Sequence, residues 1–165
     1  MNGRILLERD MFRMSVFERD RHTCVMCEHP AKDAHHILER RLWSDGGYYL
    51  DNGASLCSDC HILAEETNIS VEDLRKACKI ENPILPDNLY DEYEYDKWGN
   101  IILPNGTRIV GELFYDTSVQ KVLRCGGVLD LFLPYVKYQR TYHLPSSPTV
   151  NNDDRQLIDC QVLLL

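Results

Sequence analysis

The sequence has little basic charge for its length and no long apolar run. Its 165 residues include 18 lysines and arginines against 26 aspartates and glutamates, a formal net charge of −8. A protein-wide basic surface for nucleic acid is therefore excluded, and any contact with a phosphate backbone must come from a local patch. The longest nearly apolar run, 128–136, is interrupted by Asp130 and Pro134. It is far shorter than the about 18 residues that a membrane span requires.

The N-terminal residues lack the apolar core of a secretory signal, because only Ile5, Leu6 and Leu7 stand before the acidic Glu8. The cysteine count also fits a closed disulfide framework poorly, since 7 is an odd number. These features predict a soluble, cytoplasmic protein without a membrane partner. The length predicts one domain, or one small module with an appendage.

Four of the cysteines form two pairs of the same spacing, Cys24-x-x-Cys27 and Cys57-x-x-Cys60. In a reducing compartment this pattern is typical of zinc ligands, with four thiolates arranged tetrahedrally at about 2.3 Å from the ion. Such a site is structural, because four thiolates leave no open position on the metal. The alternatives are two unrelated thiol pairs or a redox dithiol. We expect the other cysteines to be small buried side chains; these are Cys78, Cys125 and Cys160.

The apolar pattern predicts an α+β protein. A one-sided helix is expected over 8–20, a short strand over 34–37 and a second strand over 48–50, after the glycine turn at 46–47. A further helix is expected from Ser58 onward.

Another helix follows the capping box Ser70-x-x-Asp73 and runs to about Ile80. The composition changes after Pro86, where residues 87–96 are rich in acids and tyrosines. Turn signals predict a hairpin region at 98–110, and apolar spacing predicts a helix over 118–133 interrupted at Gly126–Gly127. We therefore divide the chain into a metal-bearing unit, 1–84, and a small α+β appendage, 85–165.

Three histidines and an asparagine lie between and just after the cysteine pairs: His35, His36, Asn52 and His61. In their order and spacing, and together with the cysteine pairs and the glycine turn, they resemble the HNH endonuclease family in its zinc-stapled form. The resemblance covers about residues 9–66. It implies a ββα-metal fold, a two-stranded ribbon and a helix around one divalent cation.

Position by position, the resemblance implies that His35 and His61 bind this cation, Mg²⁺ or another divalent ion such as Mn²⁺, Ni²⁺ or Zn²⁺. It implies that His36 is the general base and that Asn52 holds the loop and orients the base. Many family members have Asp where His35 stands. The implied function is metal-dependent hydrolysis of phosphodiester bonds in nucleic acid, with DNA preferred. An imidazole with a pKa near 6.5 suits a base at neutral pH, and a cation with few protein ligands keeps open positions for phosphate and water.

Arginines near these residues are the candidate contacts to nucleic acid. Arg40 and Arg41 follow His36, whereas Arg19 and Arg21 stand beside the first cysteine pair. Contacts from such residues to phosphates give affinity without sequence readout. Each of them has an alternative role as a solvated surface charge.

Two other functions remain open from the residues alone. The histidines are also compatible with a non-catalytic, zinc-stabilised nucleic-acid-binding or scaffold module. The other is an acidic interaction protein whose tail carries the function.

Residues 137–145, with 153–155 after them, weakly resemble the segment leading into phage-type RNA ligase domains. No Lys-x-Asp-Gly motif is present, so ligase activity is not implied.

Overall fold

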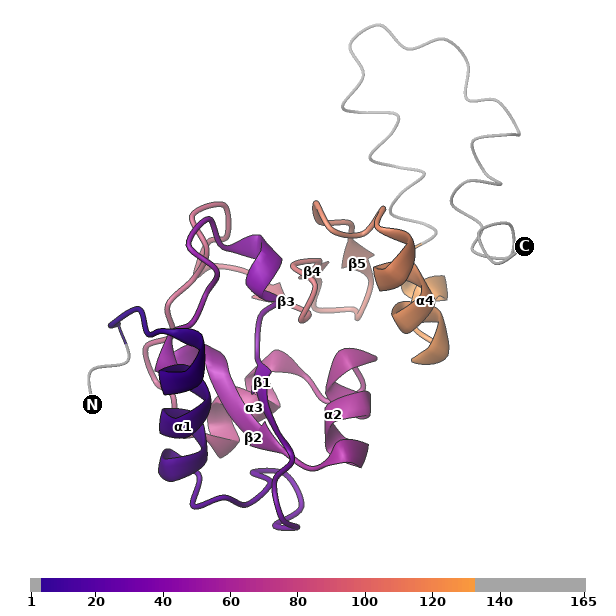
Figure 1. Ribbon diagram of the computed structural model, residues 1–165. Helices are drawn as coiled ribbons and strands as arrows, with labels where there is room; N and C mark the ends of the chain where they lie inside the picture. The colour runs from indigo at the N-terminus through magenta and orange to yellow at the C-terminus, as the bar shows by residue number, and fades with distance from the viewer. Residues whose placement is uncertain (1–3, 133–165) are drawn as a thin grey trace, which may run out of the picture.

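The computed structural model describes residues 4–132, which form a mixed α+β fold with two small antiparallel sheets (Figure 1). The first part contains α1 (Arg9–Arg19), β1 (Asp33–His36), β2 (Gly53–Leu56), α2 (Ser58–Glu65) and α3 (Val71–Ala77). The second part contains β3 (Glu94–Tyr95), β4 (Ile101–Ile102), β5 (Arg108–Ile109) and α4 (Thr117–Cys125). Within residues 4–132, no helix is long and apolar enough to cross a membrane.

Strands β1 and β2 form an antiparallel ribbon in which Asp33 pairs with Leu56 and His36 with Gly53. Successive side chains of a strand point to opposite faces, so β1 presents two different surfaces. Helix α1 lies on one side of the ribbon and α2 on the other (Figure 1). The helices predicted over 8–20 and from Ser58, and the strand predicted over 34–37, are confirmed.

The second strand predicted over 48–50 is wrong. Leu50–Asn52 form a short 3₁₀ turn, and the partner of β1 is β2, a few residues later. Leu50 packs with Phe12 on α1, which fixes the turn against that helix. The strand then begins at Gly53, where a Cβ would lie 2.4 Å from Cγ2 of Val16. Only glycine lets the strand start this close to α1, and that requirement is invisible in the hydrophobic pattern.

Helix α3 begins as its capping residues predict. The Ser70 hydroxyl accepts a 3.0 Å hydrogen bond from the Asp73 backbone N–H and donates to the Asp73 carboxylate at 2.7 Å. The helix ends at Ala77 instead of about Ile80, because Lys79 takes a left-handed backbone conformation with φ 57°. Helix α4 (Thr117–Cys125) ends at the predicted interruption, Gly126–Gly127, but the chain after it forms only a 3₁₀ turn, Leu129–Leu131, in place of the predicted continuation of the helix.

The main apolar core continues from the first part of the chain into the second. Its buried members include Ile37 next to β1, Leu56 on β2 and Leu74 on α3. Tyr95 on β3 belongs to the same cluster and is 4% exposed. A second apolar cluster is formed by Phe114, by α4 and by the residues that follow α4. Trp98, in the turn between β3 and β4, also belongs to it.

The second part of the chain holds a three-stranded meander in the order β3–β4–β5. The predicted hairpin at 98–110 corresponds to β4 and β5, whereas β3 lies in the acidic run 87–96, where the sequence analysis predicts no strand. The weak resemblance at 137–145 and 153–155, the final part of the predicted 85–165 unit and Cys160 lie outside the described residues.

A buried polar network fixes the turn between β3 and β4. Asp96, which is 2% exposed, accepts hydrogen bonds from the backbone N–H groups of Trp98 and Asn100. The side-chain amide of Asn100 bonds to the same carboxylate, and Nη1 of Arg108 approaches it at 2.8 Å. Arg108 also donates to the Thr67 hydroxyl, just after α2. The network therefore ties the meander to the helix that carries His61.

We expect Arg108→Met to destabilise the protein by about 3–5 kcal/mol, because it removes the guanidinium group that balances the charge of the buried Asp96 carboxylate. Denaturant unfolding followed by circular dichroism measures the effect. The double variant Asp96→Asn, Arg108→Met should recover most of the loss, since it removes both charges together. Lys121→Met, an exposed position on α4, is the control. Equal losses in the double and the single variant would contradict this explanation.

Candidate metal centres and active site

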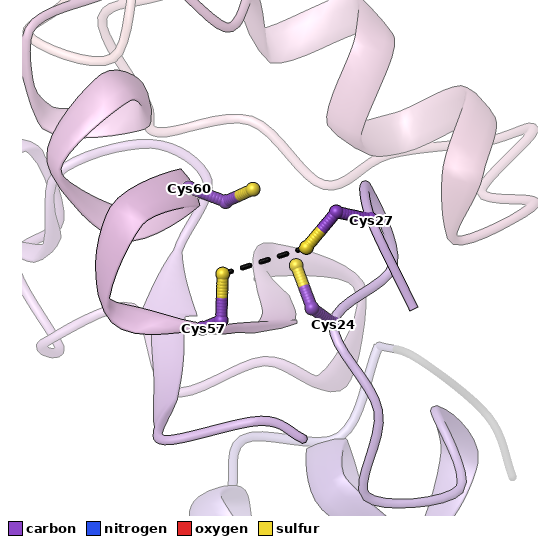
Figure 2. Close-up of side chains that lie close together, drawn as sticks. All are labelled: Cys24, Cys27, Cys57 and Cys60. Atoms are coloured by element: carbon purple, nitrogen blue, oxygen red, sulfur yellow. Dashed lines mark hydrogen bonds between the residues drawn. The ribbon is translucent and has the colours of Figure 1, made fainter. Parts of the chain in front are cut away.

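The four paired cysteines converge on one point (Figure 2). Their sulfur atoms all lie within 4.8 Å of one another, and Sγ of Cys27 is 3.5 Å from Sγ of Cys57. Cys24 and Cys27 come from the turns between α1 and β1, whereas Cys57 and Cys60 come from the start of α2. This cluster can hold a metal ion such as zinc, which would fasten α2 to the chain before β1.

The protonation of the thiols differs across the cluster. Burial opposes ionisation of Cys24, but hydrogen bonds from backbone N–H groups outweigh it and lower its pKa to about 7. Burial and the neighbouring thiols raise the pKa of Cys60 instead. Without a cation the four sulfurs therefore do not all ionise at neutral pH, and a bound metal ion supplies the positive charge that four thiolates need.

A second group of ligand atoms lies between β1 and α2. His35, His61 and Glu65 each offer an atom within 4.8 Å of the others. Oε1 of Glu65 lies 3.4 Å from Nδ1 of His35 and 3.3 Å from Nε2 of His61. The two imidazole rings meet edge to face, with their centroids 5.0 Å apart. Two imidazoles and one carboxylate form a set that suits a divalent cation and leaves positions open.

The His35 ring provides the test of whether this group fits a cation. The side chain is 2% exposed, and within residues 4–132 neither of its ring nitrogens makes a hydrogen bond, although Nδ1 lies 3.4 Å from Oε1 of Glu65. Burial, with the positive charges of Lys97 and His61, lowers its pKa well below the usual value, so the ring is neutral at pH 7. A buried, neutral imidazole with unpartnered nitrogens beside a carboxylate fits a cation-binding site, since a metal ion satisfies such a nitrogen.

Glu65 is a member of this group that the sequence reasoning missed. It lies four residues after His61 on α2, and residues four apart share one face of a helix. Burial would raise its pKa, but His61 and Lys97 outweigh this and lower it, so the carboxylate is ionised. Glu65 in turn raises the pKa of His61. The His61-x-x-x-Glu65 spacing on a predicted helix is the sequence signal that could have identified it.

His36 lies on the other face of β1, away from this group. Its ring stacks on Phe12 with a centroid distance of 4.6 Å and meets Tyr48 edge to face at 5.2 Å. Nε2 is buried and makes no hydrogen bond within residues 4–132. Burial, helped by the charges of Lys97 and Arg40, lowers the pKa of this ring to about 4. The three histidines therefore do not meet at one point: His35 and His61 pair, and His36 stands apart as a neutral imidazole.

The His36 ring lines a cavity of about 560 Å³. Its basic wall residues are Arg9 and Arg13 from α1 and Arg40, which follows β1; Asp10 and Asp33 also line it. Arg9 and Arg40 are exposed and make no salt bridge within the described chain. Asp33 also reaches Nδ1 of His61 at 3.3 Å. This residue therefore links the cavity to the neighbouring His35–His61–Glu65 group.

The Asn52 side chain holds the loop between β1 and β2. Its amide donates to the carbonyl oxygens of Leu38 and Gly47, both at 3.1 Å, and its oxygen accepts from the Leu38 N–H at 2.9 Å. Both amide hydrogens are thus used by the backbone, and no hydrogen bond joins Asn52 to the His36 ring. The expected contact with the ring is absent, whereas the expected contact with the loop is present. Asn52 positions His36 only through the backbone.

The four arginines expected to contact phosphates have different surroundings. Arg19 is bound to the Asp20 carboxylate at 2.7 Å and to the carbonyl oxygens of Leu50 and Gly53. It is therefore a structural cross-link between α1 and the start of β2, and not the expected phosphate contact. The guanidinium of Arg41 bonds to Asp116, 2.7 Å away, and to Glu39. Arg21 is exposed in a left-handed turn, and Arg40 is exposed beside His36.

Comparison of the chain with models of protein families, with curated proteins and with solved structures finds no match.

The lowered pKa of His36 makes stability depend on pH. Above about pH 6.5 the ring is neutral in both the folded and the unfolded chain. Below that pH the unfolded chain binds a proton at this ring, whereas the folded chain does so only near pH 4. The contribution of His36 should therefore lower the free energy of unfolding by about 2 kcal/mol between pH 7 and pH 5. Denaturant titrations of the zinc-loaded protein at the two pH values measure this change. In His36→Gln the free energy of unfolding should fall by about 2 kcal/mol less over the same pH range. Identical slopes would show that the ring is not shielded in the folded chain.

Proposed function

We infer that this protein is a metal-dependent endonuclease of the HNH type, with a ββα-metal core and nucleic acid, DNA in particular, as substrate. The observation that supports this most is the His35–His61–Glu65 group between β1 and α2. His36, whose Nε2 makes no hydrogen bond within residues 4–132, directly follows His35 in the chain. The order β1, β2, α2 with a cysteine cluster at the base of α2 matches what the resemblance implies.

In this proposal His35, His61 and Glu65 hold one divalent cation. When bound, the cation acts as a Lewis acid that stabilises negative charge on the phosphate and on the leaving oxygen. The cysteine cluster holds a structural zinc and takes no part in the reaction. Its role is to keep α2, and with it His61 and Glu65, against β1.

His36 is the proposed general base. In hydrolysis, the oxygen of a water molecule bonds to phosphorus while the bond from phosphorus to the 3′-oxygen breaks, which leaves 5′-phosphate and 3′-hydroxyl ends. The water gives its proton to a ring nitrogen of His36, the residue that lines the cavity. The 3′-oxygen takes a proton from solvent. Because the pKa of His36 is about 4, the ring is unprotonated at neutral pH, which is the state that a base requires.

The cavity beside His36 is the proposed path of the phosphate backbone. Arg9 and Arg40 line it and are free of ion pairs in the described chain, so their guanidinium groups can pair with phosphate oxygens. Such pairing positions the strand without reading its sequence. The net charge of −8 keeps non-specific affinity modest, so these local contacts matter more.

Plasmid nicking tests the proposal. Zinc-loaded full-length protein, with loosely bound cations removed, is mixed with supercoiled plasmid and Mg²⁺, Mn²⁺ or Ni²⁺ in separate reactions. We expect relaxed or linear plasmid with at least one of these cations, and intact plasmid with His61→Ala under the same conditions. If wild-type protein cuts with none of them but still binds the plasmid, a zinc-stabilised nucleic-acid-binding module replaces the enzyme as the best interpretation.

Arg40→Ala should weaken binding to a DNA duplex and make it less sensitive to salt. Each lost phosphate contact lowers the slope of log affinity against log salt by about 0.9. Fluorescence anisotropy in a salt series measures this slope, with Lys121→Ala on α4 as the control for loss of one positive charge. An unchanged slope in Arg40→Ala would place the nucleic acid elsewhere on the molecule.

A further inference from the structure

The second part of the chain contributes a lysine to the proposed cation site. Lys97 lies in the turn between β3 and β4, and its side chain is 4% exposed. Nζ is 3.1 Å from Oε1 of Glu65 and donates a 2.8 Å hydrogen bond to the carbonyl oxygen of His36. Oε2 of Glu39 lies 3.8 Å away. A buried ammonium thus touches both a proposed cation ligand and the backbone of the proposed base.

The turn holds this lysine rigidly. The Lys97 carbonyl oxygen accepts a hydrogen bond from the Glu39 N–H at 2.9 Å. The next residue, Trp98, is 5% exposed and donates from its indole to the carbonyl oxygen of Glu65. On the other side, Asp96 is fixed by the buried network with Asn100 and Arg108. The position of the Lys97 ammonium is therefore set by the fold, unlike that of a surface lysine.

The charge of Lys97 acts on the same carboxylate that a cation would use. Oε1 of Glu65 faces three nitrogens, those of His35, His61 and Lys97. A divalent ion that binds Glu65 must compete with the ammonium for this oxygen and is repelled by its charge. The same ammonium anchors the end of β1 through the carbonyl oxygen of His36. One side chain therefore contacts both the carboxylate that a cation would use and the strand that carries His36.

We propose that Lys97 is a positioning residue of the His35–His61–Glu65 site, which keeps its cation exchangeable and holds His36 in place for the reaction. This inference rests on the proposed function. It also implies that residues 85–132 complete the site and are not an independent appendage.

The test is Mn²⁺ binding to zinc-loaded full-length protein, measured by calorimetry, together with kcat and KM for plasmid nicking. Lys97→Met keeps the apolar stem and removes the charge. We expect Mn²⁺ to bind about tenfold more tightly, because a repelling charge near the ion is gone. We expect kcat at saturating Mn²⁺ to fall about tenfold, because the end of β1 is released, while KM for plasmid changes little. Lys97→Arg, which keeps the charge, should bind Mn²⁺ as the wild type does.

A merely structural role for Lys97 predicts the opposite change in affinity, since a loosened site binds a cation less well. Unchanged or weaker Mn²⁺ binding, or an unchanged kcat, therefore overturns the inference. Lys121→Met controls for net charge. If Lys97→Met fails to retain its zinc, Lys97→Gln, which keeps a donor without the charge, takes its place. His35→Ala and His61→Ala separate the two claims: if they bind Mn²⁺ normally, the cation site itself is refuted, whatever Lys97 does.

Discussion

His36→Ala should lower plasmid cleavage by about 10³-fold, within the range that general-base catalysis supplies. The variant should keep both metal sites, because the His36 ring lies on the opposite face of β1 from His35 and touches none of the proposed ligands. Cleavage kinetics at saturating cation and metal analysis of the same samples measure the two properties. Loss of cleavage with full metal content is the combination that distinguishes a base from a ligand.

The control for His36→Ala is His22→Ala, an exposed histidine beside the first cysteine pair. It should leave cleavage unchanged. Removal of the His36 ring also opens space beside Phe12, so the stability of the variant must be measured alongside its activity. A folded, metal-replete His36→Ala protein that cuts plasmid at the wild-type rate would remove His36 from the mechanism.

Cys57→Ser should remove the zinc and unfold the first part of the chain. Binding of a structural zinc ion contributes about 10–16 kcal/mol in small zinc domains, which is as large as the whole stability of a typical domain. Cys24 and Cys60 also belong to the main apolar core, so an open cluster exposes part of that core. We expect loss of the zinc in metal analysis and loss of cooperative unfolding in circular dichroism.

Cys125→Ser is the matched control, because Cys125 is an exposed, free thiol at the end of α4 and lies outside the cluster. It should retain one zinc and the wild-type unfolding curve. Treatment of the wild-type protein with a strong chelator should reproduce the Cys57→Ser result. A Cys57→Ser protein that stays folded with its zinc bound would contradict the structural role of the cluster.

The residues with strong local signals were predictable from sequence. The two cysteine pairs converge as their spacing predicts, and His35 and His61 meet because β1 and α2 are both tied to that cluster. Helix α3 begins at its capping box, as predicted. The cysteine spacing and the hydrogen bond of the helix cap are local signals, and the placement of the two histidines follows from the cysteine cluster, so the sequence carries this information.

Most of the features that the sequence analysis missed or placed wrongly depend on contacts between distant residues. The start of β2 is set by the close approach of Gly53 to α1, which no hydrophobic pattern records. Arg19 is a cross-link because its carbonyl partners lie more than thirty residues away in the chain. Cys125 is exposed, although scattered cysteines are expected to be buried, because it ends the outer face of α4. Lys97 reaches Glu65 only through the meander, whose first strand lies in an acidic run.

Parallel measurement of cation occupancy and cleavage is the most direct test of the claim that His35, His61 and Glu65 hold a catalytic cation. Zinc-loaded protein is titrated with Mn²⁺, and bound Mn²⁺ and the rate of plasmid nicking are followed in the same samples. We expect one exchangeable ion per chain, a nicking rate that rises in proportion to occupancy, and the loss of both in His61→Ala. Nicking at full rate before any Mn²⁺ binds, or full occupancy of this site without any nicking, would contradict the claim.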